Sequence, residues 1–229
     1  MKFTYLSIMV IMFLVIAVAV TGCTSTSPSS SNTAQTSGAA STGAASSSTP
    51  QVGSTSSASS IFGTNYNWVE YKTTASYGGK EMTTDLKDVK SDGSYQGSPA
   101  IEVKATITTS TGSSIVDDIY WDPTMSTILG GTMTMTAANG QTITENITAA
   151  QLSQMKSTNF HSGTLTFVGV EPVTVPAGSY PVASKYTYVQ SDSTGTGSTV
   201  WSAPGVPLPV KVAGTSSTGS FTMELVGWG

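Results

Sequence analysis

Cysteine and histidine are almost missing from this chain of 229 residues, which contains one of each. With Cys23 as the single thiol, the chain cannot form an intramolecular disulfide or a metal site built from several cysteines. With His161 as the single imidazole, any Ser-His-Asp arrangement would have to use it, and no Gly-x-Ser-x-Gly sequence is present. The turn-like sequence around His161 favours an exposed residue at a strand entry. We therefore expect no enzyme activity.

Arginine is absent, and residues 61–229 hold 8 lysines against 13 acids. Nucleic-acid binding needs clustered cations that neutralise phosphates, so this composition argues against a nucleic-acid partner. It argues equally against electrostatic binding to anionic lipid. The chain also lacks a phosphate-binding glycine loop, and we expect no cofactor.

Cys23 lies at the end of an apolar run, and that position indicates a processed export signal. Lys2 precedes the run Leu6–Val20, and small residues lead from it to Cys23. The order resembles the lipobox of prokaryotic lipoproteins, although Thr21 departs from the usual pattern. The resemblance implies a signal peptide over residues 1–22, lipidation of Cys23, and a membrane anchor facing outside the cytoplasm. An uncleaved membrane helix and plain secretion are the alternatives.

Residues 24–60 contain 22 serines or threonines among 37 residues and no aromatic or charged side chain. Such a segment has too little apolar surface to offset the entropy lost on ordering. The sequence therefore predicts a disordered linker over residues 23–60, with an end-to-end distance of about 35 Å. A single extracytoplasmic domain is expected over residues 61–229. Glycosylation of the linker, and of the sequon that begins at Asn146, stays open.

Alternation of apolar and polar residues with a period of two dominates the domain. It is clearest over residues 101–108, 132–136 and 221–225. Turns between such runs are predicted at Gly78-Gly79, Asp92-Gly93, Gly130-Gly131 and Asn139-Gly140. Asn139-Gly140 is the best candidate for a type I′ hairpin. Helix signals are restricted to a capping box at Thr148 and a possible start at Asp122-Pro123. The predicted fold is mainly β, a curved antiparallel sheet of half-barrel or sandwich type with one or two short helices.

Three acids, Asp117, Asp118 and Asp122, could begin a calcium site, because hard cations take six to eight oxygen ligands. Alternation on a strand sends Asp117 and Asp118 to opposite faces, and Asp122 is suited to capping. We therefore expect no metal site. The methionines are interpreted as core residues rather than copper ligands; they are Met125, Met133, Met135 and Met155.

Aromatic residues gather near both ends of the domain and could fill a core or line a binding face. We favour the core. They are Tyr66, Trp68, Tyr71, Tyr77, Tyr186, Tyr188, Trp201 and Trp228.

The last 55 residues carry a recognisable series of motifs. Val175-Pro176-Ala177-Gly178 precedes a strand, Trp201 is followed by Pro204-Gly205-Val206, and Glu224-Leu225 lies near the end. This series resembles a pattern in uncharacterised bacterial and archaeal lipoproteins, whose sheets are similar to the LolA-like half-barrel. The resemblance implies a curved sheet with an apolar concave face.

Together these features favour a membrane-anchored lipoprotein with a non-catalytic domain that binds an apolar or glycan ligand. Which residues bind it is unknown from sequence. A structural component of the cell envelope is the alternative, and a hydrolase is a weaker one.

Overall fold

The computed structural model describes residues 51–57, 61, 63, 65–147, 164–189, 198–216 and 219–229. Cys23, most of the linker, the capping box at Thr148 and His161 lie outside these residues, so the predictions made for them stay predictions. All regular elements among the described residues are β-strands. No helix in this part of the chain is long and apolar enough to cross a membrane.

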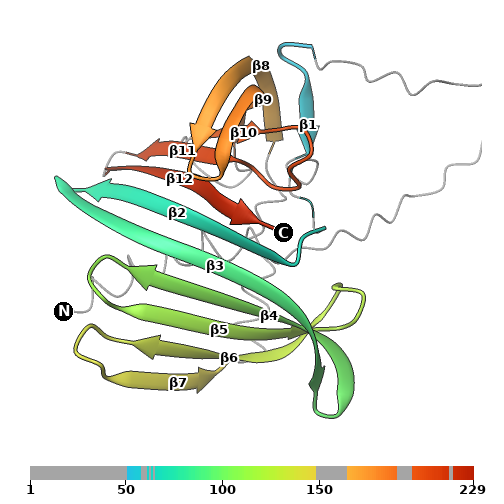
Figure 1. Ribbon diagram of the computed structural model, residues 1–229, viewed down its shortest axis with the longest axis vertical. Helices are drawn as coiled ribbons and strands as arrows, with labels where there is room; N and C mark the ends of the chain where they lie inside the picture. Colours follow the sequence, from blue (N-terminus) through green and yellow to red (C-terminus); the bar gives the residue numbers. More distant parts are fainter. Residues whose placement is uncertain are drawn as a thin grey trace, which may run out of the picture.

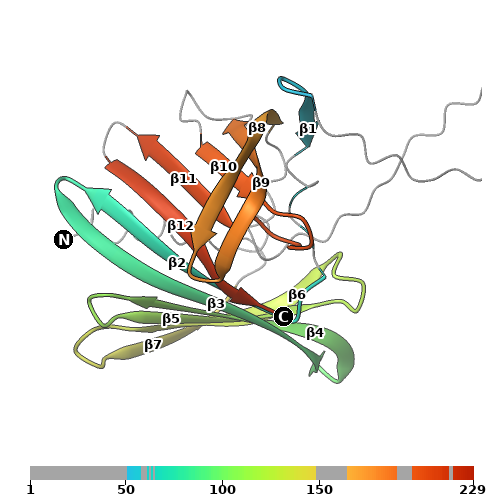
Figure 2. The ribbon, with the colours of Figure 1, turned by 45° about the horizontal axis from the view of Figure 1, so that its top comes forward.

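Twelve strands form one antiparallel sheet in the order β1-β8-β9-β10-β11-β12-β2-β3-β4-β5-β6-β7. Because β12 pairs with β2, the last strand lies in the middle of the sheet, and β1 and β7 are the edges. Figures 1 and 2 show that the sheet is twisted and curved, with β8 and β9 running across the direction of β4–β7. The predicted curved antiparallel sheet is confirmed. The strands are β1 (Thr55–Ser57), β2 (Trp68–Tyr77), β3 (Lys80–Tyr95), β4 (Ser98–Thr109), β5 (Ser114–Trp121), β6 (Ile128–Thr136), β7 (Thr142–Asn146), β8 (Thr164–Val175), β9 (Gly178–Val189), β10 (Ser198–Ser202), β11 (Lys211–Ser216) and β12 (Gly219–Trp228).

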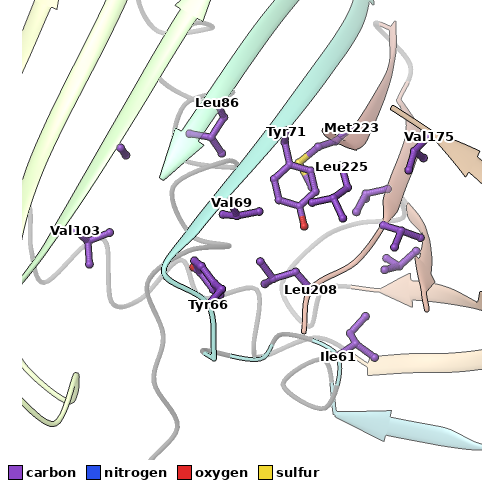
Figure 3. Close-up of a cluster of buried hydrophobic side chains, with 14 of the residues drawn as sticks. Ile61, Tyr66, Val69, Tyr71, Leu86, Val103, Val175, Leu208, Met223 and Leu225 are labelled. Carbon is purple, nitrogen blue, oxygen red and sulfur yellow. The ribbon is translucent and has the colours of Figure 1, made fainter. Parts of the chain in front are cut away.

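One face of this sheet, here called the inner face, carries the core. Side chains alternate along each strand, so that Val69 and Tyr71 of β2 are buried while Glu70 between them is only partly covered. Leu225 of β12 pairs with Tyr71 and is fully buried. Figure 3 shows Tyr71 and Leu225 side by side, with Leu208 close to them. The opposite surface, called the outer face, carries the paired lysines and acids of neighbouring strands.

Aromatic rings on the outer face lie on glycines of other strands. A Cβ added to Gly227 would lie 2.9 Å from the Trp68 ring, and one added to Gly130 would meet the Tyr95 side chain. Tyr95 also stacks on Tyr120, with 5.4 Å between ring centroids. Burial of part of each ring against a glycine stabilises aromatic residues that would otherwise be exposed.

The hairpin turns are formed by residues that adopt a positive φ. Gly78 and Gly79 join β2 to β3 with φ of 55° and 77°, and Gln96 and Gly97 join β3 to β4 with φ of 51° and 82°. Positive φ at both central residues is the pattern of a type I′ turn. The hairpin predicted at Asn139-Gly140 exists, but only Gly140 of that pair has a positive φ, so the turn is of another type.

Two further predicted turns are wrong, because their glycines lie inside strands. Gly93 lies within β3 and pairs with Ala100, and Gly130-Gly131 belong to β6. Packing explains these glycines, since Gly130 receives the Tyr95 ring and a Cβ at Gly131 would lie 2.5 Å from the Asp118 carbonyl oxygen. A glycine can therefore mark close approach within a sheet as well as a turn.

The helix predicted at Asp122-Pro123 is also wrong. Residues 122–127 form a loop between β5 and β6, in which Asp122 accepts a hydrogen bond of 2.7 Å from the Ser126 amide. Met125 has a positive φ of 56°, which is incompatible with a right-handed helix. The Asp122 carboxylate stabilises a turn here and does not cap a helix.

The folded domain begins before the predicted boundary at Ile61. Residues Thr55–Ser57 form β1 and pair with β8, and all three are exposed. Pairing at a sheet edge uses backbone hydrogen bonds, so a serine- and threonine-rich segment can join without apolar side chains. Composition alone therefore placed the boundary too late.

Candidate functional site: two buried carboxyl groups on the inner face

The acids that could have begun a calcium site are separated by the fold. Asp117 points into the core from β5, whereas Asp118 lies on the outer face, 3.5 Å from the Lys104 ammonium. Asp122 is bound within its own loop by Ser126 and Thr124. No group of three or more acidic, histidine or cysteine side chains comes together within the described ranges. The opposite orientations of Asp117 and Asp118 are as alternation predicts.

A different pair of acids is brought together by the register of three strands. Asp88 of β3 pairs with Ala105 of β4, which pairs in turn with Asp117 of β5. Their Cα atoms are separated by two inter-strand spacings, about 10 Å. Ala105 between them is buried and has no side chain beyond Cβ. Asp88 and Asp117 are each 1% exposed.

Neither carboxyl group has a hydrogen-bond partner within the part of the chain that the structure describes. Burial without partners disfavours the charged form. It raises the pKa of Asp88 to about 7, an effect that the Lys90 ammonium opposes and the charge of Asp117 adds to. Burial, with a further contribution from Asp118, raises the pKa of Asp117 to about 7. Both groups therefore change charge near neutral pH.

Lys90 is the cation beside this pair. It follows Asp88 by two residues on β3, so both side chains lie on the inner face. Its ammonium lies 3.5 Å from the centroid of the Tyr66 ring. Burial lowers the pKa of Lys90 to about 8, and the charge of Asp88 partly offsets that effect. The inner face thus already holds one ammonium group over an aromatic ring, within electrostatic reach of a carboxyl group.

The tyrosines next to the acids are fixed by the core. Burial raises the pKa of Tyr71 well above its usual value, and the neighbouring Tyr66 and Asp88 add to that effect. The Tyr71 hydroxyl donates a hydrogen bond of 2.7 Å to the Pro209 carbonyl oxygen. Burial also raises the pKa of Tyr66. Both tyrosines therefore stay protonated and neutral over the physiological range.

Apolar side chains surround the acids, together with one unpaired donor. Asp117 lies two residues from Ile119 and four from Trp121 on the same face of β5, and Leu86 and Val103 occupy neighbouring positions of β3 and β4. The Trp121 indole nitrogen is buried and has no hydrogen-bond acceptor among the described residues. This region of the inner face therefore offers unpaired acceptors and an unpaired donor within an apolar surface.

This arrangement favours binding over catalysis. Paired carboxyl groups with raised pKa values also occur in hydrolases, where they act as acid and base on a substrate that reaches them. Asp88 and Asp117 are closed off from solvent, and the nearest tyrosines are neutral. An unpaired buried polar group costs about 1–3 kcal/mol, so a molecule that supplies the missing partners would gain that energy.

The aromatic residues singled out in the sequence take several roles. Tyr66, Tyr71 and Tyr188 are buried, as predicted, whereas Trp68, Tyr77 and Trp228 are 36–40% exposed. Trp201 and Tyr186 are half-buried, and Met133 is buried in the core as expected.

Trp201 differs from the core anchor that its sequence position suggested. Its indole N–H donates a hydrogen bond of 2.7 Å to Glu171, which also pairs with Lys185 at 3.2 Å. Its neighbour Val200 is the residue that enters the core. Trp201 is thus part of the outer-face network of charged side chains.

Sequence reasoning missed Asp88, although a signal for it was present. Thr84, Leu86 and Asp88 share one face of a strand by alternation, so the carboxyl group is on the apolar side. Asp117 is in the same position relative to Ile115 and Ile119. A search for acids at the apolar positions of alternating strands would have identified both Asp88 and Asp117.

Comparison with known proteins gives a likeness in structure only. No protein-family model matches the chain, and no curated protein matches its sequence. Thirteen chains of solved structures show some structural similarity to it. One is a DUF1329 family protein from Desulfovibrio piger, with a TM-score of 0.33 and 8% sequence identity over 70% of this chain and 84% of that chain. Function is therefore inferred from the site itself.

Proposed function

We propose that this chain is a membrane-anchored lipoprotein whose β-domain faces outside the cytoplasm and binds a small ligand on its inner face, without catalysing a reaction. The observation that supports it most is the pair Asp88 and Asp117, two buried carboxyl groups without partners in an apolar surface. Proteins rarely leave such groups unpaired, and unpaired ones occur where a ligand or ion supplies the partner.

The anchor is inferred from the order of charge, apolar run and small residues before Cys23. A diacylglyceryl group there would hold the domain at the membrane surface, each buried methylene contributing about 0.8 kcal/mol. The curved antiparallel sheet is in keeping with the LolA-like resemblance of the C-terminal motifs. A domain of that shape, held on a linker, suits a ligand taken from the envelope or from outside the cell.

Metabolic labelling with a radioactive fatty acid tests the anchor. The wild-type chain is expected to carry the label and to sediment with membranes, and Cys23→Ser is expected to lose both properties. Thr24→Ser, one residue further on, is the matched control and should keep the label. Unlabelled wild-type protein in a soluble fraction would contradict the anchor.

Native mass spectrometry of the full chain, purified from membranes of its host, tests binding. We expect an adduct of constant mass on the wild type that is lost from the double variant Asp88→Asn/Asp117→Asn. Asp118→Asn, which changes the acid on the outer face, should keep the adduct. Repeated absence of an adduct, with co-purification of envelope polymer, would favour a structural envelope component instead.

A further inference from the structure

The buried charges on the inner face do not balance among the described residues. Asp88 has Lys90 beside it, and that ammonium opposes the rise in the pKa of Asp88. No described cation acts on Asp117 in this way, and the charge that does act on it is the like charge of Asp118. When both carboxyl groups are ionised, this region is short of one positive charge. Buried charges are normally paired, so a missing cation defines what a ligand must supply.

The missing cation has the chemistry of an ammonium group rather than a metal ion. Ionised carboxylates only accept hydrogen bonds, and the unpaired oxygens of Asp88 and Asp117 therefore require donors. Calcium takes six to eight oxygens, more than two carboxyl groups provide. An ammonium group carries three donors, and Lys90 shows that this surface already accommodates one beside Tyr66. An anionic ligand would be repelled.

The side chains next to Asp88 and Asp117 indicate the chemistry that the rest of the ligand must have. Val103 and Ile119 are each 1% exposed and adjoin the acid pair along β4 and β5. Both belong to the hydrophobic core, so a molecule that reaches the carboxyl groups must displace the groups that cover these residues and place apolar atoms against them. The Trp121 indole N–H, four residues from Asp117 along the same face, is available for one acceptor on that molecule.

We infer that the inner face binds a primary amine with an apolar body, whose ammonium group donates to Asp117 and Asp88. This inference rests on the proposed binding function and names its ligand class. The ammonium supplies the charge that Asp117 lacks, and the body of the ligand packs on the apolar residues of β4 and β5. Because both carboxyl groups are buried, the amine reaches them only through local opening of the domain, and binding should be slow.

The test uses the full-length protein in detergent at pH 8 and three probes of equal length: n-hexylamine, 1-hexanol and hexanoate. Each is equilibrated with the protein overnight, and the midpoint of thermal unfolding and the tryptophan fluorescence are recorded. We expect hexylamine to raise the midpoint and change the fluorescence, and the other two to have no effect. Equal responses to hexanol or hexanoate would overturn the inference without need of any variant.

Variants locate the site. Asp117→Asn should weaken hexylamine binding about tenfold or more, since hydrogen bonds to a charged group are lost. Asp118→Asn should bind as the wild type does, because that acid faces outward beside Lys104. Unchanged affinity in Asp117→Asn would overturn the inference.

A further variant tests whether the chain supplies the ammonium itself. Lys156 lies outside the described residues. If the wild type does not respond to hexylamine and Lys156→Gln does, an internal lysine occupies the position assigned to the ligand, and the inference is wrong.

Different results would contradict the inferred ligand class and the proposed binding function. A native adduct that is neutral or anionic would leave the proposed function standing and remove the amine. If no adduct is seen and no probe binds, the proposed function itself fails.

Discussion

Asp117 and Asp118 are neighbours in the chain, yet they lie on opposite faces of β5 and in opposite environments. Asp118 faces outward and forms an ion pair with Lys104. Asp117 faces inward, is 1% exposed and has no hydrogen-bond partner among the described residues. The two residues have the same chemistry, so the difference comes entirely from the face.

The same contrast holds for the sheet as a whole. On the outer face, lysines and acids pair across neighbouring strands, as in Glu70 with Lys87 and Glu224 with Lys211. On the inner face, two acids are buried in an apolar surface beside one lysine. Acids on the outer face form ion pairs with lysines, whereas Asp88 and Asp117 on the inner face have no hydrogen-bond partner among the described residues. Four predictions test this contrast, from the largest expected effect to the smallest.

Loss of a core side chain on the inner face should have the largest effect on stability. Leu225 is fully buried, and Leu225→Ala is expected to lower the free energy of unfolding by about 2–5 kcal/mol through lost burial and the cavity left behind. Lys72→Ala, at an exposed position of the adjacent strand β2, should change it by less than about 0.5 kcal/mol. Urea denaturation followed by circular dichroism measures both, and equal effects would contradict the assignment of faces.

The second-largest effect is expected in the pH dependence of the free energy of unfolding, to which Asp88 and Asp117 contribute. Their pKa values are about 7 in the folded protein and about 3.8 without the fold. Between these values the folded state holds protons that the unfolded state has released, so raising the pH favours unfolding. Each carboxyl group can lower the free energy of unfolding by at most about 1.4 kcal/mol per pH unit over that range, and the loss is complete above the folded pKa.

Urea denaturation between pH 4.5 and pH 7.5, without added amine, measures this slope. The wild type should become less stable as the pH rises, and Asp117→Asn should reduce the slope because the amide does not titrate. Asp118→Asn is the control on the outer face. A wild type that gains stability from pH 4.5 to pH 7.5, with no change in Asp117→Asn, would show that the acids have partners.

The buried hydroxyl of Tyr71 should have an intermediate effect. Tyr71→Phe keeps the ring but removes the hydrogen bond to the Pro209 carbonyl oxygen, which is left unsatisfied in the core. The expected loss is about 1–3 kcal/mol in the free energy of unfolding. Tyr77→Phe, at a position 40% exposed, should have almost no effect in the same denaturation experiment. If Tyr71→Phe leaves the free energy of unfolding unchanged, water must replace the lost hydrogen bond to the Pro209 carbonyl oxygen.

The smallest effect is expected from an outer-face ion pair. Lys104→Met removes the partner of Asp118, a pair with an N–O distance of 3.5 Å between side chains that are partly exposed. Such pairs contribute about 0–1 kcal/mol, and the difference should vanish in about 1 M salt. A loss of several kcal/mol that persists in salt would mean that the outer face is not solvated as described.

Much of the fold could be predicted because alternation is a local property of the chain. The run from Ile101 to Ile107 was predicted to alternate, and Val103, Ala105 and Ile107 are indeed buried. The prolines of the C-terminal motif were harder to interpret. Pro207 and Pro209 cannot donate to a sheet ladder, which predicts that residues 208–212 form an edge strand or the end of one. They precede β11, which lies between β10 and β12. Strand order depends on long-range pairing that local pattern does not encode.

The candidate site was less accessible to sequence reasoning. Asp88 and Asp117 are separated by 28 residues, and only the register through Ala105 brings them to one place. Composition assigns acids to the solvated surface, which is correct for Asp118 and wrong for these two. At Asp122, a loop with several side-chain hydrogen bonds replaced the expected helix, because the Asp carboxylate binds the amides that follow it.

The titration of Asp117, followed by NMR of protein labelled with carbon-13 at the aspartate carboxyl groups, tests the central claim most directly. The Asp117→Asn variant assigns the signal. The account predicts that Asp117 titrates near pH 7, because burial raises its pKa, and that added hexylamine moves its pKa downward. A carboxyl group that titrates near its ordinary value of 3.8 and does not respond to the amine would show that Asp117 is already paired within the chain, and would contradict the account.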